Sequence, residues 1–377
     1  MKREGLDWLV AADNNDYIAP EFLHVLPEEA EALKQAASRS LDLLREAARK
    51  VVRENRLSEM GIPANAHKLV AYSVQNELDD CLIGRFDFAG GLDGLPIRLL
   101  EFNADTCSLL PETAIVQEYM SRQTRPTRQP FNDLLPALER RFGRLLNRHH
   151  RQLPSLLFST MGHDEDWLNV ETLARAAHVS GFTDVHQVLL EKVIFSPGEG
   201  VFLELNRNQF LRFGFWYKHL PWDFIATEEP DLMDMLTRMV MAGELTALNP
   251  ACAMLLQCKA LLAVASELAP REPLLLRTSL RGSDFPDGRY VRKPIFGRMG
   301  ENIALYDGAG SPKAQTAGDY ANQPVVYQEL AAFNIDSDGC RYQPSIFVTD
   351  EPCALAIRRQ DALIIGDDAE YIPHWIN

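Results

Sequence analysis

The stretch "LLEFNADTCS", residues 99–108, begins with residues that favour a strand and ends in oxygen-bearing side chains. A second strand-like run, "CLIGRFDF" at 81–88, precedes it, and the glycine-rich "AGGLDG" lies between the two. Two strand-like runs separated by a glycine-rich turn are typical of a β-hairpin. The sequence therefore predicts a hairpin over residues 81–104.

One face of this hairpin is unusually polar. Side chains alternate between the two faces of a strand, so burying the phenylalanines on one face leaves four polar side chains on the other: Arg85, Asp87, Glu101 and Asn103. Three oxygen-bearing groups on one face suit Mg²⁺, and an arginine beside them suits phosphate oxygens. The alternative is a solvated sheet face with cross-strand ion pairs.

Two lysines in the second half of the chain carry a related signal. In "VRKPIFGRMGENI" (291–303), Lys293 precedes a basic, glycine-containing loop that can close over a polyphosphate. Lys259 lies in "AMLLQCKALLAV", which predicts an apolar helix, and its ammonium group either reaches solvent or points inward at a phosphate. The segment "VYQEL" (326–330) predicts a buried edge segment whose backbone could contact a flat purine.

The remaining chain reads as a mixture of helices and strands. Periodic apolar residues predict a long helix over 27–57, and a βαβ unit is predicted over 155–190. Two more helices are expected at 231–242 and 250–268. After residue 288 an antiparallel meander is predicted from short strand-like runs at 289–296, 324–333, 343–349, 353–359 and 361–366. The expected fold class is α+β, with mixed and antiparallel sheets.

Composition excludes some classes of function. The 377 residues carry a net charge of −15, which argues against nucleic acid or an anionic membrane as a partner. No apolar run reaches the roughly 18–20 residues that span a bilayer, and residues 1–16 lack the apolar region of a signal peptide. The six cysteines form no C-x-x-C pair, so we expect reduced thiols in a cytoplasmic protein, and no zinc site.

Seven stretches together resemble a known family: "GRFDF", "LLEFNADT", "CKALL", "RKPIFGRMGENI", "VYQEL", "ALAIRR" and "YIPHW". They are similar in order and spacing to the synthetase domain of glutathionylspermidine synthase and its stand-alone relatives, members of the ATP-grasp superfamily. The resemblance covers residues 80–377 and includes no amidase domain. It implies an ATP-grasp fold with a preceding α/β substrate region of the pre-ATP-grasp kind.

The resemblance implies a role for individual residues. Asp87, Glu101 and Asn103 would hold Mg²⁺, and Arg85 and Arg358 would be catalytic. The residues that would contact ATP are Arg85, Asp87, Lys259, Lys293, Met299, Gly300, Gln328, Glu329, Leu330, Gln343 and Arg358. The residues that would contact the other substrates are Thr106, Ser108, Asp164, Glu165 and His219. For Asp164 and Glu165 the alternative is a pair of ordinary acids at a helix start.

The same resemblance suggests four segments along the chain. Residues 1–80 would be a helical segment packed on the core, and 81–150 would hold the metal- and phosphate-binding hairpin with the helices that follow it. Residues 151–248 would form the βαβ substrate region. Residues 249–377 would form the nucleotide-binding lid and the antiparallel part of the ATP-grasp core.

The implied activity is an ATP-dependent ligation of a small-molecule carboxylic acid to an amine through an acyl phosphate, for example a peptide-like acid and a polyamine. His219 stands where the family has a threonine that helps to bind glutathione, so the two substrates stay open. Glutathionylspermidine synthesis is one alternative, and a nucleotide-binding regulatory protein without ligation is another. The sequence predicts no oligomeric state.

Overall fold

The computed structural model describes residues 17–124, 127–308 and 310–376. The expectation that the chain has no signal peptide rests on residues 1–16, which lie outside this part. Among the described helices, none combines the length and the apolar character that a membrane crossing requires. Whether the protein is cytoplasmic stays a prediction.

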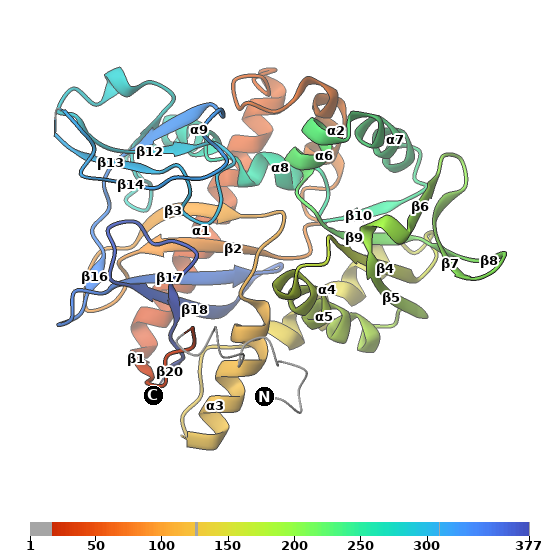
Figure 1. The fold of residues 1–377 in the computed structure, drawn as a ribbon, viewed down its shortest axis with the longest axis horizontal. Coiled ribbons are helices and arrows are strands. Elements are labelled where there is room, and N and C mark those ends of the chain that lie inside the picture. Colours follow the sequence, from red (N-terminus) through yellow and green to blue (C-terminus); the bar gives the residue numbers. More distant parts are fainter. Residues whose placement is uncertain (1–16, 125–126, 309, 377) are drawn as a thin grey trace.

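The predicted hairpin is confirmed and lies within a six-stranded antiparallel sheet (Figure 1). The strands of this sheet, in spatial order, are β19 (Glu370–Tyr371), β18 (Pro352–Gln360), β17 (Arg341–Val348), β2 (Gly84–Ala89) and β3 (Arg98–Asn103), with β16 (Asn334–Ile335) paired to β17. Arg85 lies opposite Asn103, and Asp87 lies opposite Glu101. The four polar side chains therefore share one face of the sheet, as the alternation predicts.

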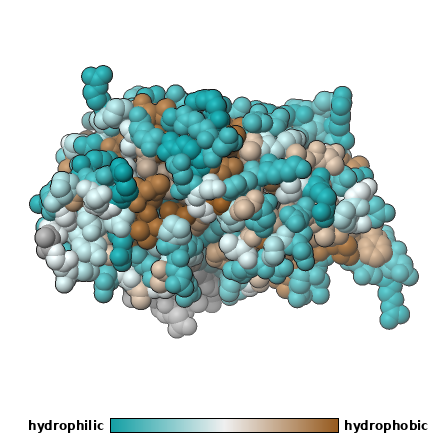
Figure 2. All heavy atoms as spheres, turned by 90° about the horizontal axis from the view of Figure 1, so that it is seen from above, coloured by the Kyte–Doolittle hydropathy of each residue, from teal (hydrophilic) through white to brown (hydrophobic). Residues whose placement is uncertain are grey.

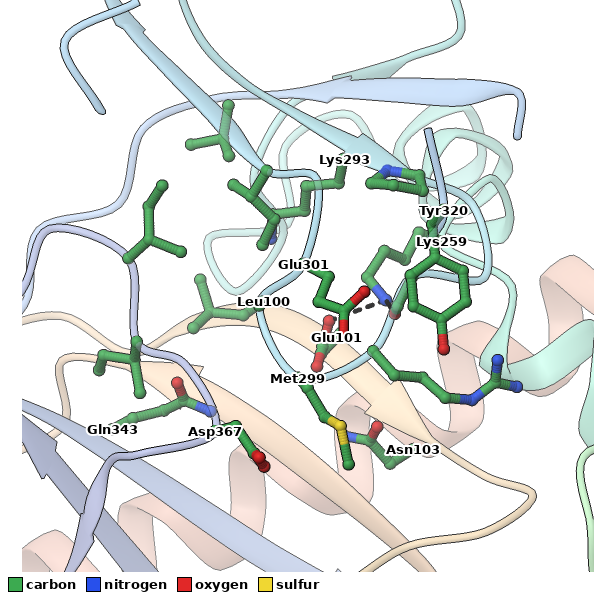
Figure 3. Close-up of a pocket in the computed structure, with 18 of the residues that line it drawn as sticks. Leu100, Glu101, Asn103, Lys259, Lys293, Met299, Glu301, Tyr320, Gln343 and Asp367 are labelled. Carbon is green, nitrogen blue, oxygen red and sulfur yellow. Dashed lines mark hydrogen bonds and ion pairs between the residues drawn. The ribbon is translucent and has the colours of Figure 1, made fainter. Parts of the chain in front are cut away.

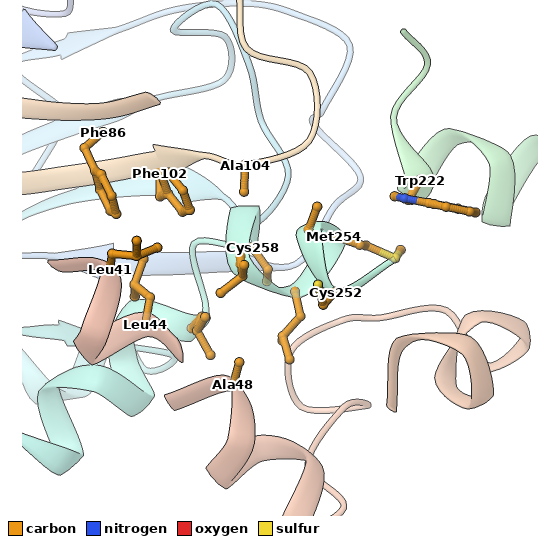
Figure 4. Packing of buried hydrophobic residues seen from close by; sticks show 14 of the residues in the cluster. Leu41, Leu44, Ala48, Phe86, Phe102, Ala104, Trp222, Cys252, Met254 and Cys258 are labelled. Atoms are coloured by element: carbon orange, nitrogen blue, oxygen red, sulfur yellow. The ribbon is translucent and has the colours of Figure 1, made fainter. Parts of the chain in front are cut away.

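The long helix α1 (Pro27–Arg53) covers the other face of this sheet (Figure 1). Pro27 occupies the first turn, two glutamates follow it, and two basic residues lie in the last turn, which suits the helix dipole at both ends. Leu41 and Leu44 of α1 pack towards Phe86 and Phe102 of the hairpin (Figure 4), whose rings stack 3.9 Å apart. This apolar layer fixes which face of the hairpin is polar.

The predicted C-terminal meander is wrong in one respect, because its strands divide between two sheets. A second, five-stranded antiparallel sheet contains, in order, β11 (Thr278–Ser279), β15 (Val325–Gln328), β12 (Arg289–Pro294), β13 (Ala304–Asp307) and β14 (Ala314–Gln315). The strands predicted at 343–349 and 353–359 correspond to β17 and β18, which join the hairpin in the six-stranded sheet. Strand β15 is not an edge, since it lies between β11 and β12.

The segment 361–366 is not a strand as predicted, but a turn and loop. Its consecutive apolar residues, Leu363, Ile364 and Ile365, line a cavity instead of pairing with a neighbouring strand. An apolar run alone could not distinguish these two environments, because both of them bury side chains.

The predicted βαβ unit is confirmed. It consists of β4 (Ser155–Thr160), α5 (Asp164–Val179) and β5 (Asp184–Leu189), and its two strands are parallel. They belong to a four-stranded parallel sheet with the order β10 (Thr246–Leu248), β9 (Phe215–His219), β4 and β5. A small antiparallel sheet of β6 (Val193–Ser196), β7 (Gly200–Asn206) and β8 (Gln209–Phe213) lies at one side of it (Figure 1).

The helix predicted over 250–268 is wrong as a single element. It is divided into α8 (Cys252–Gln257) and α9 (Leu261–Leu268), because Cys258 adopts an extended backbone with φ −62° and ψ 119°. The backbone N–H of Lys259 donates to the Ile295 carbonyl at 2.9 Å. Lys259 therefore lies at a break between two buried helices, and its side chain leaves the apolar layer at that point.

The other elements complete the core around these sheets. The remaining helices are α2 (His67–Asn76), α3 (Gln117–Thr124), α4 (Leu134–Arg148), α6 (Trp222–Glu228) and α7 (Pro230–Met241), and the predicted helix at 231–242 is thereby confirmed. The short helical turns are η4 (Ala64–Ala66), η5 (Glu112–Val116, a π-helix), η6 (Leu190–Lys192) and η7 (Gly282–Asp284), and strands β1 (Leu23–Val25) and β20 (His374–Ile376) pair in parallel. Figure 2 shows a mostly hydrophilic face with separate hydrophobic patches, as the high charge content implies.

Candidate active site

A cavity of about 370 Å³ lies where the two antiparallel sheets and the parallel region meet. The six-stranded sheet contributes its polar face, the five-stranded sheet contributes Lys293, and the break before α9 contributes Lys259 (Figure 3). Of the residues expected at the site from the sequence, the following line it: Arg85, Glu101, Asn103, Thr106, Ser108, Glu165, His219, Lys259, Lys293, Met299, Gly300, Gln328, Glu329, Leu330, Gln343 and Arg358.

Asp87 lies beneath the cavity and is fully buried. Both of its carboxylate oxygens accept hydrogen bonds from Arg85, at 2.8 Å and 3.0 Å, and the Asn103 amide donates to Oδ2 at 3.0 Å. Arg358 approaches the same oxygen to 3.8 Å. A carboxylate held by this many donors is rigid, so Asp87 fixes the orientation of Arg85 at the cavity floor.

The other end of Arg85 points towards the loop after β3. Its Nη1 donates to the Ser108 carbonyl at 3.0 Å and approaches the Ser108 hydroxyl at 3.3 Å. Arg85 is only 5% exposed. Its guanidinium group contacts both the hairpin face and the segment that follows β3.

Two lysines face the hairpin across the cavity. The Lys259 ammonium lies 3.0 Å from Glu101 Oε2, as Figure 3 shows, and donates to the Gly297 carbonyl at 2.7 Å. Lys293 donates to the Gln328 side chain at 2.8 Å. The inward alternative for Lys259 is therefore the one that the structure supports, since its side chain lines the cavity and does not reach out to solvent.

Burial and these neighbours shift two pKa values. Burial lowers the pKa of Lys293 to about 8, although the Glu101 carboxylate opposes that shift. Burial alone would raise the pKa of Glu101, but the ammonium groups of Lys259 and Lys293 outweigh it and lower this pKa to about 2. Glu101 is therefore an anion throughout the physiological pH range. Lys293, with its pKa of about 8, loses its proton just above that pH range.

The donors needed for Mg²⁺ lie together on the hairpin face. Among the described residues there is no group of three His, Cys, Asp or Glu that could hold a metal ion, but the expected set contains Asn103 as its third member. Two carboxylates and a carboxamide are hard oxygen donors that Mg²⁺ accepts together with water and phosphate. The residues present therefore fit the ion, with Arg85 and Lys259 paired to the two carboxylates in this structure.

The loop that connects β12 to β13 covers part of the cavity. Met299, Gly300 and Asn302 in it have positive φ values of 54°, 72° and 51°, and a side chain at Gly300 would meet the Ile365 carbonyl at 2.8 Å. Only glycine tolerates both that conformation and that close approach. The loop thus packs directly against the 361–366 segment on the far side of the cavity.

The end of the cavity nearest the parallel sheet is acidic. It is lined by Glu165 and Asp166 from the start of α5, by Asp367, and by His219 at the end of β9. The His219 Nε2 lies 3.1 Å from Asp166 Oδ1. Burial raises the pKa of Glu165, and the nearby Asp367 and Asp166 raise it further.

The expected pair Asp164 and Glu165 is not brought together in the cavity. Asp164 is exposed and is not among the lining residues, whereas Asp166 is. Because helical neighbours point about 100° apart, choosing between three consecutive acids required the orientation of α5. The sequence offers no signal for that orientation.

Two long-range contacts were missed from the sequence. Asp105 forms a fully buried ion pair with Lys218 at 2.5 Å, and Asp223 forms a bidentate pair with Arg298. Asp105 stood in the quoted motif, but its partner lies 113 residues away. No local pattern connects residues at such separations.

The fold is similar to that of a solved structure. The chain superimposes on a glutathione synthetase-like effector from Globodera pallida, in its apo form, with a TM-score of 0.58 at 9% identity, covering 96% of this chain and 90% of that one. This chain therefore shares the fold of that effector.

The chain belongs to the glutathionylspermidine synthase family, since the family model "Glutathionylspermidine synthase preATP-grasp" matches residues 1–377. It is 29% identical over 319 residues to a Haemophilus influenzae protein named "Putative acid--amine ligase", covering 82% of this chain and 77% of that relative. It is also 24% identical over 334 residues to the bifunctional glutathionylspermidine synthetase/amidase of Escherichia coli K12, covering 82% of this chain and 52% of that enzyme. The chain thus spans about half the length of the bifunctional relative, and the resemblance found in the sequence is confirmed.

Proposed function

We propose that this protein is an ATP-dependent acid–amine ligase of the ATP-grasp type, forming an amide through an acyl phosphate and releasing ADP and phosphate. The observation that carries the proposal is the hairpin face, on which Glu101 and Asn103 line one cavity opposite Lys259 and Lys293. Asp87 lies directly beneath this cavity, bound to Arg85 and Asn103. The names of the relatives support a ligase.

The cation-rich end suits the phosphates of ATP. Lys259, Lys293 and Arg358 supply positive charge from the break before α9, from β12 and from β18. Such positioned positive charge is the main requirement of phosphoryl transfer. Gln328, Glu329 and Leu330 would border the adenine, with Gln343 nearby. Asp87, Glu101 and Asn103 would hold Mg²⁺, which neutralises phosphate charge when bound.

The chemistry then follows in two steps. A carboxylate oxygen of the acid attacks the γ-phosphorus, and the bond from that phosphorus to the bridging oxygen breaks, so that ADP leaves. The amine nitrogen next attacks the acyl carbon, the bond from that carbon to the phosphate oxygen breaks, and phosphate leaves while the nitrogen loses a proton. Arg85, held by Asp87 and directed at Ser108, would stabilise the negative charge that develops in both steps.

The acidic end suits the substrates. Thr106 and Ser108 border the boundary between the two ends, and Glu165 with His219 would contact the acid or the amine. A carboxylate cluster favours an ammonium group, so an amine with more than one positive charge is a reasonable substrate class. The protein is proposed to act on small molecules, and no nucleic acid or membrane enters the mechanism.

We expect glutathione with spermidine to be a poor substrate pair. His219 is 6% exposed and its ring is held by Asp166, so a substrate must fit around a fixed imidazole. Losing a buried polar contact costs about 1–3 kcal/mol, or roughly 10- to 100-fold in affinity.

The test is a screen of carboxylic acids and amines for phosphate release, with mass spectrometry to identify the amide. One acid and one amine should together stimulate ATP turnover and give a product of the summed mass less water. Efficient formation of glutathionylspermidine would show that the expectation from His219 is wrong. ATP binding without turnover for any pair would favour a regulatory protein instead.

A further inference from the structure

Residues 297–303 form a loop, here called the phosphate loop. Hydrogen bonds hold it to one neighbouring segment, residues 316–320. The Thr316 hydroxyl donates to the Gly300 carbonyl at 2.6 Å, and the backbone N–H of Asp319 donates to the Glu301 side chain at 2.7 Å. The Tyr320 N–H donates to the Asn302 side chain, also at 2.7 Å. The phosphate loop and residues 316–320 therefore form one unit.

An ion pair also holds the phosphate loop to a different part of the molecule, the helix α6. Arg298 donates to both oxygens of Asp223, at 2.6 Å from Nη2 and 3.1 Å from Nη1. Asp223 lies in α6, is 5% exposed, and is followed by Phe224, over whose ring the guanidinium lies at 5.0 Å. Bidentate, largely desolvated pairs of this kind are the strong ones.

The segment that carries Asp223 is itself rigid. The Lys218 ammonium and the backbone N–H of Trp222 occupy the two oxygens of Asp105, at 2.5 Å and 2.7 Å. This segment begins beside His219 at the acidic end of the cavity. Asp223 is therefore a fixed anchor on the acceptor side, and Arg298 is the group of the phosphate loop that binds to it.

Besides residues 316–320 and Asp223, the phosphate loop contacts Lys259, which donates to the Gly297 carbonyl at 2.7 Å, and it lies against Ile365 at Gly300. The Met299 side chain is 55% exposed, so it contributes little buried apolar surface that would oppose opening of the loop. Of these contacts, the bidentate pair of Arg298 with the buried Asp223 is the one that joins the loop to α6, and its loss should favour opening of the loop.

We propose that Asp223 is a positioning residue that latches the phosphate loop, through Arg298, to the wall of the acceptor end. The latch keeps the loop closed over the cation-rich end and makes its closure depend on the α6 segment that borders the acceptor. This inference rests on the proposed function only for the identity of the loop's ligand, a nucleotide phosphate. The ion pair and its effect on the loop do not depend on any ligand.

Limited trypsin digestion tests the latch in the protein without ligands. Trypsin needs the arginine side chain in its own binding pocket, so Arg298 is protected while it is bound to Asp223. We expect Asp223→Asn to accelerate cleavage after Arg298 by about tenfold or more, because cleavage follows the population of the open loop. The matched control is Asp307→Asn, which removes an exposed pair with Lys313 in the same sheet and should leave that rate unchanged.

A second variant covers the case in which Asp223→Asn does not fold. Arg298→Lys keeps the charge and the trypsin site but loses the two-pronged contact, so it should also be cut faster. Cleavage after residue 298 at the wild-type rate in both variants would overturn the latch. So would faster cleavage at all sites together with a lowered melting temperature, because that pattern indicates general destabilisation.

A non-hydrolysable ATP analogue with Mg²⁺ separates the latch from the proposed function. If the loop binds nucleotide phosphates, the analogue should slow cleavage in wild type and in Asp223→Asn. The KM for ATP of the variant should rise about tenfold with kcat within about threefold, because nucleotide binding must then close the loop unaided. An analogue that protects neither protein would count against the nucleotide site, while the digestion without ligand still decides the latch.

Discussion

The two ends of the cavity are built from different parts of the fold and carry opposite charge. The cation-rich end, with Lys259, Lys293 and Arg358 around Glu101, rests on strands of two sheets and on the break before α9. The acidic end, with Glu165 and Asp367, rests on a helix start and on a loop.

This difference teaches which end is free to vary. Side chains on paired strands are fixed by the register of the sheet. Side chains on helix ends and loops change position with small changes in sequence. We therefore propose that the acidic end is the part that selects substrates.

The largest expected effect is at the cation-rich end. Glu101→Gln removes a proposed metal ligand and leaves Lys259 without its carboxylate partner. We expect ADP formation to fall about 1000-fold, or about 4 kcal/mol, as when a charge-stabilising group is lost elsewhere. Steady-state assays, with circular dichroism to verify folding, provide the measurement. Wild-type turnover in this variant would mean that the hairpin face has no metal role.

The next effect concerns the buried carboxyl group of Glu112, whose charged neighbours include Glu165 and Arg85. Glu112 is fully buried, its Oε1 accepts from Tyr17 at 2.8 Å, and burial raises its pKa from the ordinary 4.5 to about 7, with Glu165 raising it further and Arg85 opposing. Because the pKa of Glu112 is higher in the folded state, its protonated form contributes to the free energy of unfolding. This contribution is fully present below pH 4.5 and is lost as the pH rises through about 7.

Glu112→Gln should therefore remove this pH dependence. The interval from 4.5 to about 7 corresponds to about 3 kcal/mol of unfolding free energy. Urea unfolding at several values between pH 4.5 and pH 8 should show the variant gaining on wild type by up to that amount. Two parallel stability curves would mean that Glu112 does not titrate in this range.

At the acidic end we expect a smaller and more selective effect. Glu165→Gln should raise the KM for the amine by roughly 30-fold, about 2 kcal/mol, with the KM for ATP unchanged. The matched control is Asp164→Asn, one residue away and exposed outside the cavity, which should change neither KM. If Glu165→Gln altered the KM for ATP as strongly as that for the amine, the two ends would not be separate sites.

The smallest expected effect is a pH profile. With a pKa of about 8, Lys293 loses its charge above that pH, so kcat/KM for ATP should fall about tenfold per pH unit, or about 1.4 kcal/mol. Lys293→Arg keeps its charge and should remove this decline, whatever its absolute rate. A decline that persists in the arginine variant must come from another group.

The sequence predicted the cation-rich end better than the acidic end, for physical reasons. The polar hairpin face followed from strand alternation, because burying Phe86 and Phe102 leaves no choice for Asp87 and Glu101. Asp166 instead of Asp164 depends on how α5 is rotated against its sheet, and that rotation is set by tertiary packing.

The errors in the fold have a similar origin. Residues 250–268 are mostly apolar, so periodicity could not reveal the break at Cys258 that brings Lys259 to the cavity. The pair Asp223–Arg298 joins residues 75 positions apart, and only the folded chain brings them together. The roles given to the site residues and the four-segment division stay predictions.

Hydroxylamine trapping tests the central claim, activation of an acid at the cation-rich end, most directly. The protein is incubated with Mg²⁺, ATP and the acid found in the screen, with hydroxylamine in place of the amine. Because hydroxylamine attacks an acyl phosphate directly, we predict equal amounts of ADP and of the acid's hydroxamate, and neither product with Glu101→Gln. Formation of AMP, or of ADP without hydroxamate, would contradict the proposed acyl-phosphate mechanism.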